Sequence, residues 1–235
     1  MQVFCGKESG GQIKISNVKK SFDRFSLHIE SLDISKGKIY GIIGPNGCGK
    51  TTAMKVMAGV VKPDKGKIEY DGLSTRDVTM VLRKPYLLHD TVFRNLVYPL
   101  KIRKIKPDKT MIEHYLEIAG LTEYRNEYAP GLSSGEQQKL ALIRALIFKP
   151  KMIFIDEIFS NMDIESVAFF EDYILKLQKE NPITWVFISH QLSTIRRLCE
   201  YTFFMSNGSI STSGATEELL TRSDNEELKK FLQFI

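Results

Sequence analysis

The stretch GPNGCGKTT, residues 44–52, matches G-x-x-x-x-G-K-T, the pattern of a loop that wraps a phosphate group. The apolar run at 39–43 before it predicts a short buried strand, and residues 51–57 after it predict a helix, which is the context that this pattern needs. The glycines allow successive backbone N–H groups to face one anion, and the helix adds its positive N-terminal end. The sequence therefore predicts a polyphosphate site at this strand-to-helix turn.

Individual residues of this loop have separate expected roles. We expect Lys50 to contact the β- and γ-phosphates, Thr51 to place its hydroxyl on Mg²⁺, and Thr52 to reach another phosphate oxygen. The rest of the expected phosphate-binding set is Gly44, Asn46, Gly47 and Gly49. Cys48 lies at a loop position that tolerates several residue types, so the sequence assigns it no chemistry.

The composition is that of an ordinary globular domain. With 235 residues, 43% hydrophobic and 26% charged, the chain falls outside the disordered, collagen-like and repeat classes. The net charge is +5, and the basic run at 101–109 is its most visible part. That run could face phospholipid headgroups or nucleic acid, but a solvated basic face is favoured. Because no aromatic residues interleave it, no nucleic-acid partner is expected.

Cysteine and histidine positions bear on the compartment. Cys5, Cys48 and Cys199 form no C-x-x-C pair, and the four histidines show no metal-ligand spacing to them. This pattern indicates a reducing cytosol and predicts no structural zinc. The N-terminus has no signal-peptide core, and no apolar run approaches the roughly 18 residues that cross a bilayer. Work at a membrane would therefore require a separate membrane-spanning chain.

Strand and helix signals predict one α/β domain over residues 1–235. Residues 1–89 and 151–235 read as the α/β core, which begins with two half-buried antiparallel strands around Ile13 and Leu27. Residues 90–150 have helical periodicity and predict an inserted helical subdomain. Further strands are expected at 67–70, 78–82, 152–155, 185–188 and 201–205, and an amphipathic helical tail at 216–235.

A second polar turn, LSSGEQQ at 132–138, opens an apolar helix. Ser133 and Glu136 have the spacing of a capping box, which by itself indicates only a well-capped helix. Gly135, however, also allows an anion to approach the helix N-terminus, as at a second phosphate-binding end. A single nucleotide has no evident need for two such ends, so the residues alone leave both interpretations open.

Acidic and basic side chains follow two of the expected buried strands. Asp156 and Glu157 come directly after 152–155, at the carboxyl end of a strand, where ligands bind in open α/β sheets. Asp156 is placed to hold Mg²⁺, and Glu157 to polarise the attacking water. Asp163 either caps the next helix or reaches a partner chain, and His190 is either structural or directed at the γ-phosphate.

In order and spacing these motifs resemble the ATP-binding cassette (ABC) ATPase family over nearly the whole chain. The matching stretches are the loop at 44–52, the signature LSSGEQQ at 132–138, IFIDE at 153–157, SNMD at 160–163 and His190. The resemblance implies a P-loop NTPase fold: a RecA-like core with an N-terminal antiparallel β subdomain and an inserted α-helical subdomain. It also implies a head-to-tail dimer, in which ATP is held by the loop of one copy and the signature of the other, so that Ser133, Ser134, Gly135 and Glu136 act in trans.

The family pattern also assigns roles to single residues. It implies that Thr51 and Asp156 hold Mg²⁺, that Glu157 is the catalytic carboxylate and that His190 senses the γ-phosphate. Phe22 ends the first expected strand, and on the residues alone a core Phe is favoured over a ring that stacks on a purine. The family usually has a Tyr stacked on adenine there, so the resemblance favours stacking.

The chain departs from the family pattern at four positions. Ser134 replaces a Gly, Ile158 a frequent Pro and Met162 a common Leu in the D-loop, and these changes are mild. The fourth is Arg83, which aligns with the Q-loop glutamine that contacts Mg²⁺ and links the site to the transmembrane partner. A guanidinium cannot ligate a metal, so Arg83 is expected either to point away or to contact phosphate itself.

The function implied by the resemblance is ATP hydrolysis that powers transport through separate transmembrane permease subunits. It implies a cytoplasmic homodimer, peripheral on the inner face of the membrane, that works with a solute-binding protein in an importer. The stretch TVFRNLVYPLKIR, residues 91–103, resembles importers of tungstate or molybdate and gives a slight preference for oxyanions. The alternatives are a non-transport ABC ATPase of the cell-division or lipoprotein-release type, and an ATP-binding scaffold with little turnover.

Overall fold

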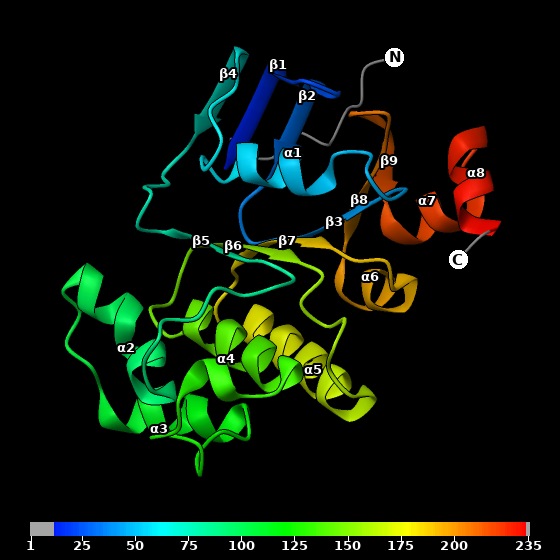
Figure 1. Ribbon diagram of the computed structural model, residues 1–235. Helices are drawn as coiled ribbons and strands as arrows, with labels where there is room; N and C mark the ends of the chain where they lie inside the picture. Colours follow the sequence, from blue (N-terminus) through cyan, green and yellow to red (C-terminus); the bar gives the residue numbers. More distant parts are fainter. Residues whose placement is uncertain (1–11, 234–235) are drawn as a thin grey trace.

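The computed structural model describes residues 12–233, whose strands form one nine-stranded sheet in the order β4-β1-β2-β9-β8-β3-β7-β6-β5 (Figure 1). The strands are β1 (Ile13–Phe22), β2 (Phe25–Ile34), β3 (Ile39–Ile43), β4 (Lys65–Tyr70), β5 (Val78–Val81), β6 (Met152–Asp156), β7 (Thr184–Ile188), β8 (Tyr201–Ser206) and β9 (Ser209–Ala215). The helices are α1 (Lys50–Met57), α2 (Val92–Arg103), α3 (Lys109–Ile118), η1 (Ala129–Gly131), α4 (Ser134–Leu146), α5 (Ile164–Glu180), α6 (Leu192–Leu198), α7 (Thr216–Arg222) and α8 (Glu226–Gln233).

The centre of the sheet is parallel and covered on both faces. β8, β3, β7, β6 and β5 all pair in parallel, and every residue of β3, β6 and β7 is buried. Along β6, Met152 and Phe154 pack with α1, whereas Ile153 and Ile155 pack with α4 and α5 on the opposite face. Figure 1 shows α1 on one side of these strands and α4 and α5 on the other. The near-continuous apolar strands follow from this two-sided burial.

The N-terminal strands continue the same sheet in antiparallel order. β1 pairs with both β2 and β4, and one parallel pairing, His28 with Ser209, joins β2 to β9. Alternate residues such as Ile13, Ile15 and Leu27 are buried, as the sequence predicts for half-buried strands. The antiparallel part therefore lies beside the phosphate-binding side of the core, with α1 between the two in Figure 1.

Between β5 and β6 the chain forms helices and no strand of the sheet. Thr91 and Asp108 cap α2 and α3 by accepting hydrogen bonds from Arg94 N and Met111 N. Asn95 is fully buried, and its amide donates to the carbonyls of Leu88, Asp90 and Thr91, which fixes the connection from the core into α2.

The structure differs from the sequence-based expectations in three places. Strand ends differ by one or two residues, and β9 was not predicted, because SISTSGA lacks the apolar alternation of a half-buried strand. The tail is two helices, α7 and α8, separated at 223–225, where Asn225 accepts from Leu228 N. Cys5 and Ile235 lie outside the described residues. Within 12–233, no helix combines the length and the apolar composition that crossing a bilayer needs.

Candidate nucleotide site

The loop between β3 and α1 has a conformation that requires glycine. Gly44 and Gly49 have positive φ angles of 149° and 104°. A Cβ at Gly49 would overlap the ring of Phe25, and one at Gly44 would overlap the backbone oxygen of Met205. Gly49 is also the N-cap of α1, where no side chain caps the first turn. The amide groups of that turn are therefore available to an anion.

Lys50 is buried and bonded to the loop itself. Its Nζ donates to the carbonyl oxygens of Gly44 at 2.7 Å and Pro45 at 2.9 Å. Burial lowers the pKa of Lys50, although Cys48, Glu157 and Asp156 oppose the shift. The ammonium thus lies at the concave side of the loop, where a phosphate oxygen can take over from the carbonyls.

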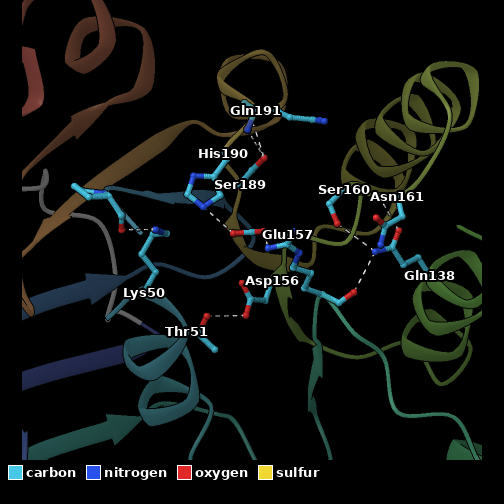
Figure 2. Close-up of polar contacts among 12 residues, drawn as sticks. Lys50, Thr51, Gln138, Asp156, Glu157, Ser160, Asn161, Ser189, His190 and Gln191 are labelled. Carbon is cyan, nitrogen blue, oxygen red and sulfur yellow. Dashed lines mark hydrogen bonds and ion pairs between the residues drawn. The ribbon is translucent and has the colours of Figure 1, made fainter. Parts of the chain in front are cut away.

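Thr51 and Asp156 bring two oxygen ligands together at the end of β6. The Thr51 hydroxyl donates to Asp156 Oδ2 at 2.8 Å (Figure 2). Burial raises the pKa of Asp156, and the Thr51 hydrogen bond opposes this. Among the described residues no group of three or more His, Cys, Asp or Glu side chains can hold a metal. A pair of hard oxygen donors suits Mg²⁺, which keeps several waters and takes further oxygens from phosphates.

Glu157 is held by two side chains that come from different segments. Its Oε1 lies 2.9 Å from His190 Nε2, and its Oε2 lies 3.1 Å from Arg83 Nη1 (Figure 2 shows the His190 contact). The Glu157 backbone has φ 50°, and its N–H donates to the Ile188 carbonyl at 2.9 Å. The Arg83 contact is neither of the two outcomes expected from sequence: the guanidinium faces the site and binds the carboxylate.

A cavity of about 300 Å³ opens beside Glu157. Asn46 of the loop, Arg83, Ser160 and His190 line it together with Glu157. Residues 133–136 are not among its lining residues. Within one chain the structure therefore brings together the loop, the acidic pair and His190, and leaves the signature turn outside.

The signature turn has the predicted capping box. Ser133 is the N-cap of α4; its Oγ accepts from Glu136 N at 3.3 Å, and its N–H donates to Glu136 Oε2 at 2.8 Å. A Cβ at Gly135 would lie 2.9 Å from the Asn161 carbonyl oxygen. The start of α4 therefore packs closely on the 160–163 turn, and this position has little room for a side chain. Ser134, the first residue of α4, is exposed.

Gln138 is a buried residue that the sequence analysis missed. Its Nε2 donates to the Arg83 carbonyl at 3.1 Å and to Ser160 Oγ at 3.4 Å, and its Oε1 accepts from Asn161 N at 3.2 Å. Figure 2 shows it between α4 and the turn before α5. The sequence feature that could have pointed to Gln138 is a glutamine on the apolar face of a helix. Gln138 joins the signature helix to the segments on both sides of Glu157.

Asp163 caps α5, which is one of its two expected roles. It accepts from Ser166 N at 2.7 Å, and the Ser166 hydroxyl donates to its other oxygen, also at 2.7 Å. These bonds lower the pKa of Asp163 to about 2. The carboxylate therefore stays ionised at neutral pH.

Phe22 is not a core residue. Its side chain is 48% exposed, and its ring stacks on that of Phe25 with centroids 6.3 Å apart. Phe25 in turn is the residue that a Cβ at Gly49 would meet. An exposed aromatic ring thus stands beside the phosphate loop, as adenine stacking would require.

Comparisons with known proteins show the family and the fold of this chain. The model of the family described as ABC transporter matches residues 27–160. A dimeric ATP-binding cassette solved in a post-hydrolysis state with ADP and phosphate has a TM-score of 0.77 at 24% identity, and the match covers 87% of this chain and 98% of that one. The structural likeness shows the fold: a P-loop cassette with a mixed α/β core.

Three curated relatives are ATP-binding subunits of import systems by name. The tungstate uptake protein TupC of Peptoclostridium acidaminophilum is 38% identical over 85% of this chain and 96% of its own. A probable sulfate/thiosulfate import protein, CysA of Chlorella vulgaris, is 32% identical over 94% and 98%. The methionine import protein MetN 1 of Listeria monocytogenes is 30% identical over 94% and 71%. Because the family model covers more than half of the chain and these relatives match over most of their length, the chain belongs to the ABC transporter family and is one of its ATP-hydrolysing cassettes.

Proposed function

We propose that this cassette powers uptake of a solute through separate transmembrane chains, on whose cytoplasmic side it docks as a peripheral subunit. The observation that supports the proposal is that one chain supplies only part of the nucleotide site. The loop, Glu157 and His190 meet at one cavity, whereas the signature turn lies outside it. A second copy, placed head to tail, would supply Ser133, Ser134, Gly135 and Glu136 and enclose the nucleotide.

Hydrolysis is assigned to residues that already lie together. Lys50 and the first turn of α1 bind the phosphates, with Thr52 and the loop amides, and Phe22 stacks on adenine. Thr51 and Asp156 hold Mg²⁺, which neutralises phosphate charge when bound. Glu157 orients and polarises the attacking water, and His190 binds near the γ-phosphate. We also assign 1–89 and 151–235 to the core with its β subdomain, and 90–150 to the helical subdomain.

The surface proposed for the transmembrane partner is a groove of about 390 Å³ between β5, α2 and α4. Exposed apolar side chains, Tyr86 at 76% and Ile102 at 55%, stand at this docking groove. Arg103 and Arg144 add two guanidinium groups to its lining, and Arg103 also stacks on Phe148 at 3.6 Å. An apolar wall with fixed cations fits a short amphipathic helix that carries acidic residues.

Ile102→Glu should prevent docking, because it places a charge at the apolar wall of the groove. We expect at least a tenfold loss of the membrane chain that copurifies with the cassette, together with loss of partner-stimulated ATP hydrolysis. Val60→Glu is the matched control, since Val60 is also exposed, at 65%, and does not line the groove. Equal copurification for both variants would place the docking surface elsewhere.

For the transported solute we propose an oxyanion. The tungstate and sulfate/thiosulfate relatives and the 91–103 stretch support this choice, whereas the methionine relative supports import alone. The full assembly would include a solute-binding protein that captures the anion. Uptake of labelled tungstate or molybdate by vesicles that contain the assembled complex is the test, with methionine as the competing solute. Uptake of methionine without oxyanion uptake would overturn the assignment.

Cys48 provides a separate probe of the loop. Burial raises the pKa of its thiol above the ordinary value, against the opposing effect of Lys50. Because the thiolate is the reactive form, alkylation at neutral pH should be slow and should accelerate as the pH rises. ATP should protect Cys48 from alkylation, and peptide mass mapping with and without ATP measures this protection. Alkylation of Cys48 should in turn block nucleotide binding. Cys48→Ser is the control for this block, because it has no thiol at that position to alkylate. The same alkylation rate with and without ATP would show that the loop does not close over phosphate.

A further inference from the structure

The segment 81–86 faces two cavities at once. Val81, Leu82, Pro85 and Tyr86 line the docking groove, whereas Arg83 lines the cavity beside Glu157. One short loop therefore separates the surface proposed for the transmembrane partner from the water-activating carboxylate. A ligand in the groove would press on the residues that flank Arg83.

Glu157 has both carboxylate oxygens engaged. His190 contacts one and Arg83 the other, and the Glu157 backbone is fixed by bonds to Ile188 and Ser160. A general base needs an oxygen directed at a water molecule, within hydrogen-bond reach of the proton that it takes. The Arg83 guanidinium occupies one of these oxygens at 3.1 Å, and His190 lies against the other at 2.9 Å, so neither is left free to meet a water molecule. In this arrangement Glu157 is held back from its reaction.

Arg83 is the contact that can be withdrawn. His190 follows the buried strand β7, whereas the Arg83 side chain is 65% exposed and projects from the loop. The Arg83 carbonyl accepts from Gln138, so the loop also follows any shift of α4. Because the Arg83 end of this ion pair is exposed, the pair contributes little to folding, and salt weakens it. Its position is thus better suited to control than to structural support.

We propose that Arg83 restrains Glu157 in the undocked cassette and that a partner in the docking groove removes the restraint by moving the 81–86 segment. This proposal rests on the assignment of Glu157 as the water-activating carboxylate. It gives Arg83 an inhibitory role, one that a neutral glutamine at the same position could not fill through charge. Basal hydrolysis is then low because the base is paired, and docking raises it.

The test compares the ATP hydrolysis of the full chain with that of Arg83→Ala, Arg83→Lys and Arg83→Gln, without any membrane partner. Arg83→Ala should raise the basal kcat about threefold to tenfold at about 50 mM salt and leave KM unchanged, as expected for loss of one exposed ion pair. The difference from the unmodified chain should become smaller near about 500 mM salt, because salt weakens the pair. Arg83→Lys should keep most of the restraint, and Arg83→Gln should behave like alanine.

Arg94→Ala is the matched control. Arg94 is similarly exposed, at 69%, and pairs with Asp90 at 3.3 Å, but it lines neither cavity. Its basal rate and salt dependence should equal those of the unmodified chain. The partner's stimulation of hydrolysis is the ratio of the rate with the partner to the basal rate. For Arg83→Ala this ratio should be smaller than for the unmodified chain, by the same factor by which its basal rate is higher.

Two results distinguish a failure of the Arg83 restraint from a failure of the Glu157 assignment. The restraint is wrong if Arg83→Ala leaves the basal kcat unchanged, lowers it, or raises KM, and Arg83 then acts on phosphate or not at all. In that case an inactive Glu157→Gln in the same assay would still support the assignment of the carboxylate. If Glu157→Gln keeps full activity, that assignment fails and the restraint fails with it. Thermal unfolding of each variant verifies that the chain is folded.

Discussion

Glu157→Gln is expected to lower ATP turnover by about 10³-fold and to leave ATP binding intact, which is a typical loss for removal of a positioned general base. The amide has nearly the same shape and still accepts a hydrogen bond, so the contact at His190 Nε2 can persist. What is lost is the charge that draws the proton from water. Phosphate release measures the turnover, and equilibrium binding of labelled ATP measures the affinity.

Glu171→Gln is the control for this experiment. Glu171 is a buried carboxylate, paired with Arg197 at 3.0 Å, but it lies on α5 and lines neither cavity. Its neutralisation should lower the free energy of unfolding and preserve turnover per folded molecule. Full activity of Glu157→Gln, or equal losses for both variants, would contradict the assignment of the carboxylate.

Ser133→Asp is expected to lower hydrolysis strongly although the nucleotide still binds to the single chain. Aspartate is as good an N-cap as serine, but it loses the bond that the Ser133 hydroxyl donates to Glu136 Oε2 at 2.7 Å, so circular dichroism must verify that α4 still forms. In the proposed dimer the new carboxylate would face the γ-phosphate of the other copy. Two unit charges about 4 Å apart repel by about 4 kcal/mol at an effective dielectric near 20, enough for at least a 10²-fold loss.

Ser133→Asn separates charge from capping, because asparagine is an equally good N-cap without charge. We expect it to retain most of the hydrolysis. Steady-state rates and ATP affinity of both variants are the measurements. If Ser133→Asp weakened ATP binding to the isolated chain as much as it lowered the rate, the signature turn would act on its own nucleotide, and the head-to-tail arrangement would be wrong.

Much of the fold and of the candidate site followed from local sequence patterns. The loop at 44–52, the capping box at Ser133 and the acids after β6 each depend on residues close together in the chain, where periodicity and turn chemistry are informative. Because parallel strands meet at one edge of the sheet, the ends of β6 and β7 could be expected to converge. The structure bears this out with Glu157 and His190 in contact.

Other features depend on packing between distant segments, which periodicity does not encode. The contact between Arg83 and Glu157 depends on how the segments around residues 83, 157 and 190 pack together. Gln138 reads as an ordinary polar residue of a helix until its neighbours are placed around it. The polar strand β9 forms because the edge of β8 offers it hydrogen bonds, an effect of context that strand propensity misses. The exposure of Phe22 likewise required the fold.

The central claim, that ATP is held between two copies of this chain, is tested most directly by molecular mass in solution. Light scattering of Glu157→Gln with ATP and Mg²⁺ should give twice the 26.9 kDa of the chain, and with ADP the single mass. The double variant Glu157→Gln with Ser133→Asp should bind ATP and remain at the single mass, because repulsion at the signature turn prevents closure. A Glu157→Gln chain that stays at the single mass with bound ATP, or a double variant that still dimerises on ATP, would contradict the account.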